Sequence, residues 1–92
     1  AHYFVSKAGL EMLTRVLALE LAPKIRVNGV GPGTVAYPES FDDALREKLR
    51  LAIPMKRIGD VDDIARAVLV LVRDAPFVTG QVICVDGGRS AR

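Results

Sequence analysis

The first residues of the chain place a tyrosine and a lysine one helical turn apart. Tyr3 and Lys7 stand at positions i and i+4 of a segment that predicts a helix, so both side chains leave it on one side. A phenol has an ordinary pKa of about 10, and a fixed ammonium beside it favours the phenolate and lowers that pKa. The pair could therefore act as a general acid/base. The alternative is an aromatic ring and a cation that share a solvated helix face by accident.

A second segment with chemical potential is the glycine- and proline-rich stretch Gly31-Pro32-Gly33-Thr34-Val35. It follows a β-branched run, and ligands of open α/β sheets bind beyond the carboxyl ends of the strands. Glycines at such a place let the backbone approach a flat ligand, and the amides of Thr34 and Val35 could hydrogen-bond to it. In the alternative, the glycines only make a sharp exit from the strand.

Helices and strands alternate around these two segments. We predict a first helix over residues 2–22, a strand over 25–30, a second helix that begins at Ser40 as a capping box with Asp43, a third helix capped by Asp60, and a strand over 81–86. Short apolar strands separated by helices predict a parallel pair with a helical crossover. Because a parallel sheet is buried on both faces, two strands do not complete it, and we expect further strands before residue 1.

The first helix is apolar around most of its circumference. Five of its polar residues fall along one stripe: Tyr3, Lys7, Glu11, Thr14 and Arg15. The remaining apolar arc is wider than packing on one side of a sheet requires. We therefore expect this helix to be buried on two sides, by its own sheet and by a second subunit.

Composition excludes several classes of function. The 13 basic and 11 acidic residues are interspersed and aromatics are only 5%, so nothing supports a nucleic-acid surface. The apolar run 67–72 is far too short to cross a bilayer, and no cluster has the spacing of a metal site. The lone Cys84, which we expect to be buried in the last strand, forms no internal disulfide, as is typical of a reducing compartment. Asp86, before two glycines, is expected to fix a turn.

Four motifs occur in order and at characteristic distances. They are Tyr3-x-x-Ser6-Lys7-Ala8, Arg26-Val27-Asn28-x-Val30-x-Pro32-Gly33, Arg57-x-Gly59 before an aspartate-rich helix start, and Val78-Thr79-Gly80-Gln81 leading to Val85-Asp86-Gly87-Gly88. With them, essentially the whole chain resembles the C-terminal part of a classical short-chain dehydrogenase/reductase. Segments 37–40, 74–80 and 87–90 are most similar to bacterial pteridine reductases. The resemblance implies one α/β domain over residues 1–92, the C-terminal portion of a Rossmann-like doubly wound parallel sheet in the order helix-strand-helix-helix-strand.

The resemblance also implies residue roles. Tyr3 would donate the proton in carbonyl or imine reduction, while Lys7 would bind the nicotinamide ribose and lower the pKa of the tyrosine. The nicotinamide itself would be lined by Pro32, Gly33, Thr34 and Val35. Apart from the resemblance, Tyr37 is a candidate to face the substrate, because it lies in the loop that follows and binding residues concentrate in loops. The family's phosphate-binding turn, active-site serine and cofactor-selecting residues would precede residue 1; NADP(H) is expected more than NAD(H).

The expected function is an NAD(P)H-dependent oxidoreductase that reduces a pterin, in a cytoplasmic homodimer or homotetramer joined through the first helix and the C-terminal strand region. The first alternative is a reductase of 3-oxoacyl or other carbonyl substrates. The second, from another class, is a catalytically silent oligomerisation fragment. The 92 residues alone are expected to be inactive, because they are too few to hold a dinucleotide.

Overall fold

The structure is a computed structural model that describes the backbone of residues 2–91 and the side chains of residues 8–91. Its elements are helix α1 (His2–Leu21), strand β1 (Gly29–Pro32), helix α2 (Asp43–Leu51), helix α3 (Val61–Leu69), which continues into the π-helical turn η1 (Val70–Asp74), strand β2 (Val82–Val85) and the 3-10 turn η2 (Arg89–Ala91). The predicted order of helix, strand, helix, helix and strand is confirmed.

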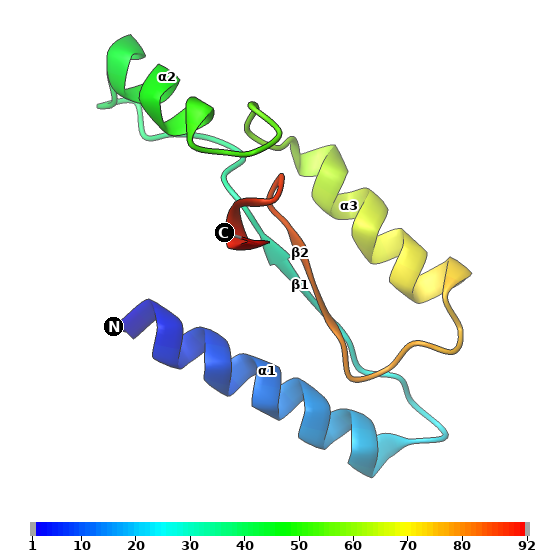
Figure 1. Ribbon diagram of the computed structural model, residues 1–92. Coiled ribbons are helices and arrows are strands. Elements are labelled where there is room, and N and C mark those ends of the chain that lie inside the picture. The colour runs from blue at the N-terminus through cyan, green and yellow to red at the C-terminus, as the bar shows by residue number, and fades with distance from the viewer. Residues whose placement is uncertain (1, 92) are drawn as a thin grey trace.

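The two strands form a parallel pair, as predicted. Gly29 lies opposite Val82 at one end of the pair, and Pro32 lies opposite Val85 at the other. The chain between the strands forms the crossover, which contains α2 and α3. In Figure 1 the strand pair lies between α1 and α3, so helices flank it as in an α/β layer structure.

The predicted limits of the first strand were wrong. β1 begins at Gly29 rather than Ile25, and it continues through Gly31 to Pro32. Upstream of β1, the chain bonds instead to the turn before β2: the Val27 amide donates to Thr79 Oγ1 at 3.0 Å, and the Gly80 amide donates to the Val27 carbonyl at 2.7 Å. The pairing partner of this stretch lies some fifty positions along the chain (|i−j| = 52), so local pattern did not indicate it.

The helix starts follow local hydrogen bonding. Asp42, not the predicted Ser40, caps α2, because its carboxylate accepts from the Leu45 amide at 2.8 Å. Asp60 caps α3 as predicted and accepts from the Asp62 amide at 3.0 Å. These carboxylates satisfy amides that the first helical turn leaves without partners, and they complement the positive end of the helix dipole.

The core of the described chain is small. Its buried apolar residues are Ala18, Ile53 and Leu71. Thr14, a member of the polar stripe, is also buried, and its hydroxyl donates to the Leu10 carbonyl at 2.8 Å. Large apolar side chains of α1 stay uncovered within the described residues, with Leu19 at 82% and Leu10 at 61% exposure.

The burial expected on two sides of α1 is therefore absent from the described part of the chain. Cys84, predicted to be buried, is exposed in the described part of the chain. Among residues 2–91, no helix combines the length and apolar character that crossing a membrane requires.

Candidate active site

The carboxyl ends of β1 and β2 and the N-terminal end of α1 lie toward the same end of the molecule (Figure 1). Tyr3 and Lys7 belong to α1, whose helical backbone keeps the spacing that puts positions i and i+4 on one side. Their side chains lie outside the described residues. The structure thus places both residues in helix α1. The orientation of the phenol and the ammonium stays a prediction.

The exit from β1 offers unused backbone donors. The Gly33 amide donates to the Val85 carbonyl at 2.9 Å, which ends the ladder, and the Thr34 carbonyl accepts from the Gly59 amide at 2.8 Å. Within the described residues, no hydrogen bond uses the amides of Thr34 and Val35. Two such donors beyond a strand end fit the expected contact with a nicotinamide carboxamide.

Gly33 has a packing reason to be glycine. A Cβ at this position would lie 2.7 Å from Asp86 Cα and 2.8 Å from Asp86 Cβ, closer than such atoms approach in proteins. The exits of the two strands therefore touch at Gly33. This contact accounts for the glycine without a ligand, while the amides of Thr34 and Val35 remain the groups suited to one.

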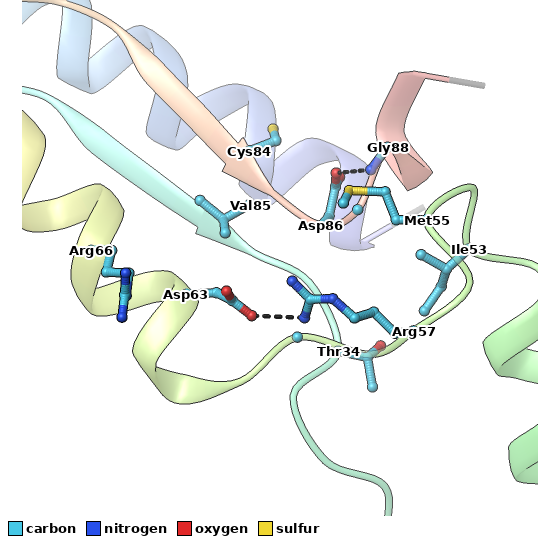
Figure 2. A pocket seen from close by; sticks show the side chains of 12 residues that line it. Thr34, Ile53, Met55, Arg57, Asp63, Arg66, Cys84, Val85, Asp86 and Gly88 are labelled. Atoms are coloured by element: carbon cyan, nitrogen blue, oxygen red, sulfur yellow. Dashed lines mark hydrogen bonds and ion pairs between the residues drawn. The ribbon is translucent and has the colours of Figure 1, made fainter.

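A cavity of about 390 Å³ lies beside this exit, within the usual size range of ligand sites. Figure 2 shows its wall, to which β2, its exit turn, α3 and the connector between α2 and α3 contribute. Of the predicted site residues whose side chains the structure describes, Thr34 lines it, and Pro32, Gly33, Val35 and Tyr37 do not. Sequence reasoning missed the apolar part of this wall, which includes Ile53, Met55 and Val85.

An ion pair crosses the wall of the cavity. Arg57 donates to the Asp63 carboxylate at 2.9 Å, as Figure 2 shows. The same carboxylate accepts from the Asp60 amide at 2.8 Å. The hydrogen bond from Arg57, and then that from the Asp60 amide, lower the pKa of Asp63, and the bond to Asp63 raises the pKa of Arg57.

The motif Arg57-x-Gly59 thus has a structural meaning. Arg57 ties the connector to the first turn of α3, and the Gly59 amide ties it to Thr34. The sequence carries a signal for this arrangement, since the arginine directly precedes the aspartate-rich helix start. Their pairing was not predicted.

The turn after β2 closes the other side of the cavity. Asp86 accepts from the Gly88 amide at 3.1 Å and the Ser90 amide at 3.0 Å, so the prediction that it fixes a turn is confirmed. Gly87 has a φ of +65°, and a Cβ there would lie 2.8 Å from Ile53 Cγ2. Both the left-handed backbone and the close contact favour glycine.

Tyr37 lies apart from the cavity, in the loop between β1 and α2. Its ring stacks on Phe41, with centroids 6.0 Å apart and planes at 23°. Its hydroxyl is buried and has no hydrogen-bond partner among the described residues. Among the described residues, no group of three or more His, Cys, Asp or Glu side chains is placed to hold a metal ion.

The parallel pair and its helical crossover define a Rossmann-like α/β protein, and the strand exits lie where such proteins bind ligands. Residues 1–90 match the profile of a family described as enoyl-(acyl carrier protein) reductase. The chain belongs to this family, which is part of the short-chain dehydrogenases/reductases.

Sequence relatives and a solved structure agree with this assignment. The chain is 43% identical over 90 residues to the granaticin polyketide synthase putative ketoacyl reductase 2 of Streptomyces violaceoruber, covering 94% of this chain and 36% of that protein. It is 45% identical over 87 residues to the 3-oxoacyl-(acyl-carrier-protein) reductase of Bos taurus, with the same coverage of 94% and 36%. A C-terminal deletion mutant of Thermoplasma acidophilum aldohexose dehydrogenase superposes with a TM-score of 0.83 at 36% identity, over 98% of this chain and 45% of that chain.

The chain thus spans 36% of the length of these two sequence relatives. Its elements are those of the C-terminal part of a short-chain dehydrogenase/reductase, as the sequence motifs predicted.

Proposed function

We propose that the complete protein is an NAD(P)H-dependent reductase of carbonyl substrates, and of 3-oxoacyl thioesters in particular. The observation that carries this proposal is the 43% and 45% identity to two ketoacyl reductases over 94% of the chain. These relatives favour the first alternative substrate class, 3-oxoacyl and other carbonyl compounds. Pterin reduction, the first expectation from the motifs at 37–40, 74–80 and 87–90, receives no support from them.

In this proposal, two residues of the first helix carry out the proton transfer. A bound nicotinamide dinucleotide would supply the hydride that reduces the carbonyl carbon. The Tyr3 hydroxyl gives its proton to the carbonyl oxygen, which yields an alcohol and leaves a tyrosinate. The Lys7 ammonium, one turn away, stabilises that tyrosinate and also binds the nicotinamide ribose.

The exit of β1 orients the cofactor. The amides of Thr34 and Val35, which no group in the described chain uses, would hydrogen-bond the nicotinamide carboxamide, and Pro32 and Gly33 would line the ring. We propose NADP(H) rather than NAD(H) as the cofactor, which parallel assays with both will test.

The proposed setting is a homodimer or homotetramer in the cytoplasm, joined through α1 and the C-terminal strand region. Support comes from the uncovered apolar side chains of α1, such as Leu10 and Leu19. Large apolar side chains that stay exposed along one helix favour an interface with another element or subunit. The lone cysteine supports a reducing compartment.

A cofactor-oxidation assay on the complete protein tests the function. Loss of the absorbance of NADPH or NADH is followed with an acetoacetyl thioester and, separately, with dihydrobiopterin. We expect turnover of the thioester. Turnover of dihydrobiopterin alone would restore the pterin substrate, and turnover of neither would favour a catalytically silent oligomerisation role.

A matched pair of variants tests the roles of the helix residues. Tyr3→Phe removes the proton donor and is expected to abolish reduction while the oligomer persists in size-exclusion chromatography. Ser6→Ala removes a hydroxyl from the same helical turn and is expected to retain activity. Equal rates for wild type and Tyr3→Phe would show that Tyr3 is not the proton donor.

A further inference from the structure

The peptide between Thr34 and Val35, just beyond β1, is held from one side. Its carbonyl, that of Thr34, accepts a hydrogen bond from the Gly59 amide at 2.8 Å. This peptide bond is trans, and in a planar trans peptide the N–H points opposite to the C=O. The bond from Gly59 therefore also sets the direction of the Val35 amide, which points away from Gly59.

That direction leads toward the helix that carries the proposed proton donor. Gly59 lies two residues before α3, and the strand pair lies between α3 and α1 (Figure 1). An amide that points away from Gly59 thus points away from the α3 side, toward the layer of α1. Thr14 of α1 faces this side of the strands, because its Oγ1 lies 3.9 Å from the place of a Cβ on Gly29. Tyr3 and Lys7 precede Thr14 by three and two helical turns, so their positions share its face of the helix.

The residues on either side of Gly59 are tied to the first turn of α3 by one carboxylate. Asp63 Oδ2 accepts from Arg57 Nη1 at 2.9 Å and from the Asp60 amide at 2.8 Å. The arginine precedes Gly59 by two positions, and the amide follows it directly. The carboxylate thus holds segment 57–60 in place, with the Gly59 amide inside it.

Gly59 lies between this carboxylate and Val35. A Cβ built on Gly59 would lie 3.5 Å from Val35 Cγ1 and 3.7 Å from Asp63 Oδ2, which are ordinary contact distances. The carboxylate and the Val35 side chain therefore lie around the same residue. A shift of segment 57–60 after loss of the ion pair would change the position of the Gly59 amide, and with it the direction of the Val35 amide.

We propose that Arg57 and Asp63 position the nicotinamide without touching it. Their ion pair keeps the Gly59 amide on the Thr34 carbonyl, and this bond directs the Val35 amide to the nicotinamide carboxamide. The inference rests on the proposed function, in which that amide binds the carboxamide, and it adds two positioning residues. A donor that is held in its binding direction before the ligand arrives costs no reorganisation when the ligand binds.

Affinity for two ligands separates positioning from a general loss of structure. One ligand is the oxidised dinucleotide that the turnover assay identifies, and the other is the same molecule without its nicotinamide, the corresponding ADP-ribose. Arg57→Met in the complete protein removes the donor and keeps an unbranched side chain. We expect it to weaken binding of the dinucleotide about fivefold, the effect of one neutral hydrogen bond, and to leave the affinity for the ADP-ribose unchanged. Arg57→Lys keeps the charge, and we expect it to recover part of the lost affinity.

Arg66→Met is the matched control. Arg66 also lines the cavity and pairs with Asp62 at 2.6 Å, but it has no described hydrogen bond to segment 57–60. We expect this variant to keep both affinities. Equal losses for the two ligands in Arg57→Met, or no loss for either, would overturn the inference while turnover by wild type upheld the proposed function. A wild type that binds no dinucleotide would overturn both.

Hydrogen exchange, followed by NMR, reports on the Val35 amide itself. In the wild type we expect the dinucleotide, but not the ADP-ribose, to slow exchange at this amide. Arg57→Met should lose most of that protection. Exchange at Val35 that the dinucleotide leaves unchanged in the wild type would refute the inference without any variant.

A pair of substitutions at Gly59 tests the same step without a change of charge. Gly59→Pro removes the amide N–H that bonds to Thr34, whereas Gly59→Ala keeps it and places its Cβ at ordinary contact distances. We expect the selective loss of dinucleotide affinity in the proline variant alone. Equal dinucleotide affinities of the two variants would contradict the proposed role of the bond.

Discussion

Replacing Arg26 with methionine removes a donor that several backbone carbonyls share at the end of the third helix. Arg26 Nη1 donates to the carbonyls of Leu71 at 2.8 Å, Ala75 at 3.1 Å and Val78 at 3.1 Å. Its Nη2 donates to the Val72 carbonyl at 3.2 Å. The last turn of a helix leaves such carbonyls without intrahelical partners, and a cation there also complements the negative end of the dipole.

The expected cost follows from this geometry. A hydrogen bond from a charged donor contributes about 1.5–3 kcal/mol. The three contacts of Nη1 share one nitrogen and do not add, and the contact with Val72 is exposed to water. We therefore expect Arg26→Met to lower the free energy of unfolding of the complete protein by about 2–3 kcal/mol.

Urea unfolding measures this loss, with Arg73→Met as the control. Arg73 lies at the end of the same helical segment, but it is exposed and pairs only with the adjacent Asp74 in the contacts described. We also expect faster hydrogen exchange at the Gly80 amide, which bonds to the Val27 carbonyl beside the arginine. A loss below about 0.5 kcal/mol, the level of an exposed ion pair, would refute the reasoning.

Two further predictions concern the strand exits and the connector. Gly33→Ala forces a Cβ to within 2.7 Å of Asp86 Cα, and we expect it to lower the free energy of unfolding, measured in urea, by about 1–3 kcal/mol. The control Gly9→Ala adds a Cβ in α1 that meets nothing within 4 Å, and it should be neutral or stabilising by up to about 1 kcal/mol. Equal effects of the two substitutions would contradict the packing argument. The Arg57 hydrogen bond holds the pKa of Asp63 below its ordinary value of 3.8 in the folded protein, so its contribution to stability is present above that value and is lost as the pH falls through the lower, folded-state pKa. Unfolding curves recorded across this acid range should show a smaller pH dependence for Asp63→Asn than for wild type, and identical profiles would show that the ion pair is not coupled to folding.

Features set by neighbouring residues were predictable from sequence. Asp60 caps its helix with bonds to residues within three positions, so its role was evident from the local pattern. The nearby error at Ser40 has the same origin, because Asp42 is an equally good cap two positions later. The parallel pairing of the strands followed from the helices that separate them.

Features that depend on distant segments were not predictable. The stretch before Gly29 was predicted as a strand, yet its bonding is decided by the turn around Thr79. The burial of Thr14 and the exposure of Cys84 depend on which elements cover them. At the site, the exit at Gly33 was found from composition, while the pair of Arg57 and Asp63 required knowing how the connector folds back onto α3.

The bond from the Gly59 amide to the Thr34 carbonyl has a consequence for how such a protein diversifies. This hydrogen bond brings the two ends of segment 34–59 together, so that the segment forms a closed loop, here called the first ring. The rest of the crossover, from 59 to β2, forms a second ring. The first ring holds the aromatic pair and α2, and it begins and ends at the same point beside the sheet. Because the entropy of closing a ring grows only slowly with its length, this ring can lengthen, shorten or be exchanged while its anchor stays in place. The segment from 34 to 59 can thus change in length or sequence without a change in the sheet.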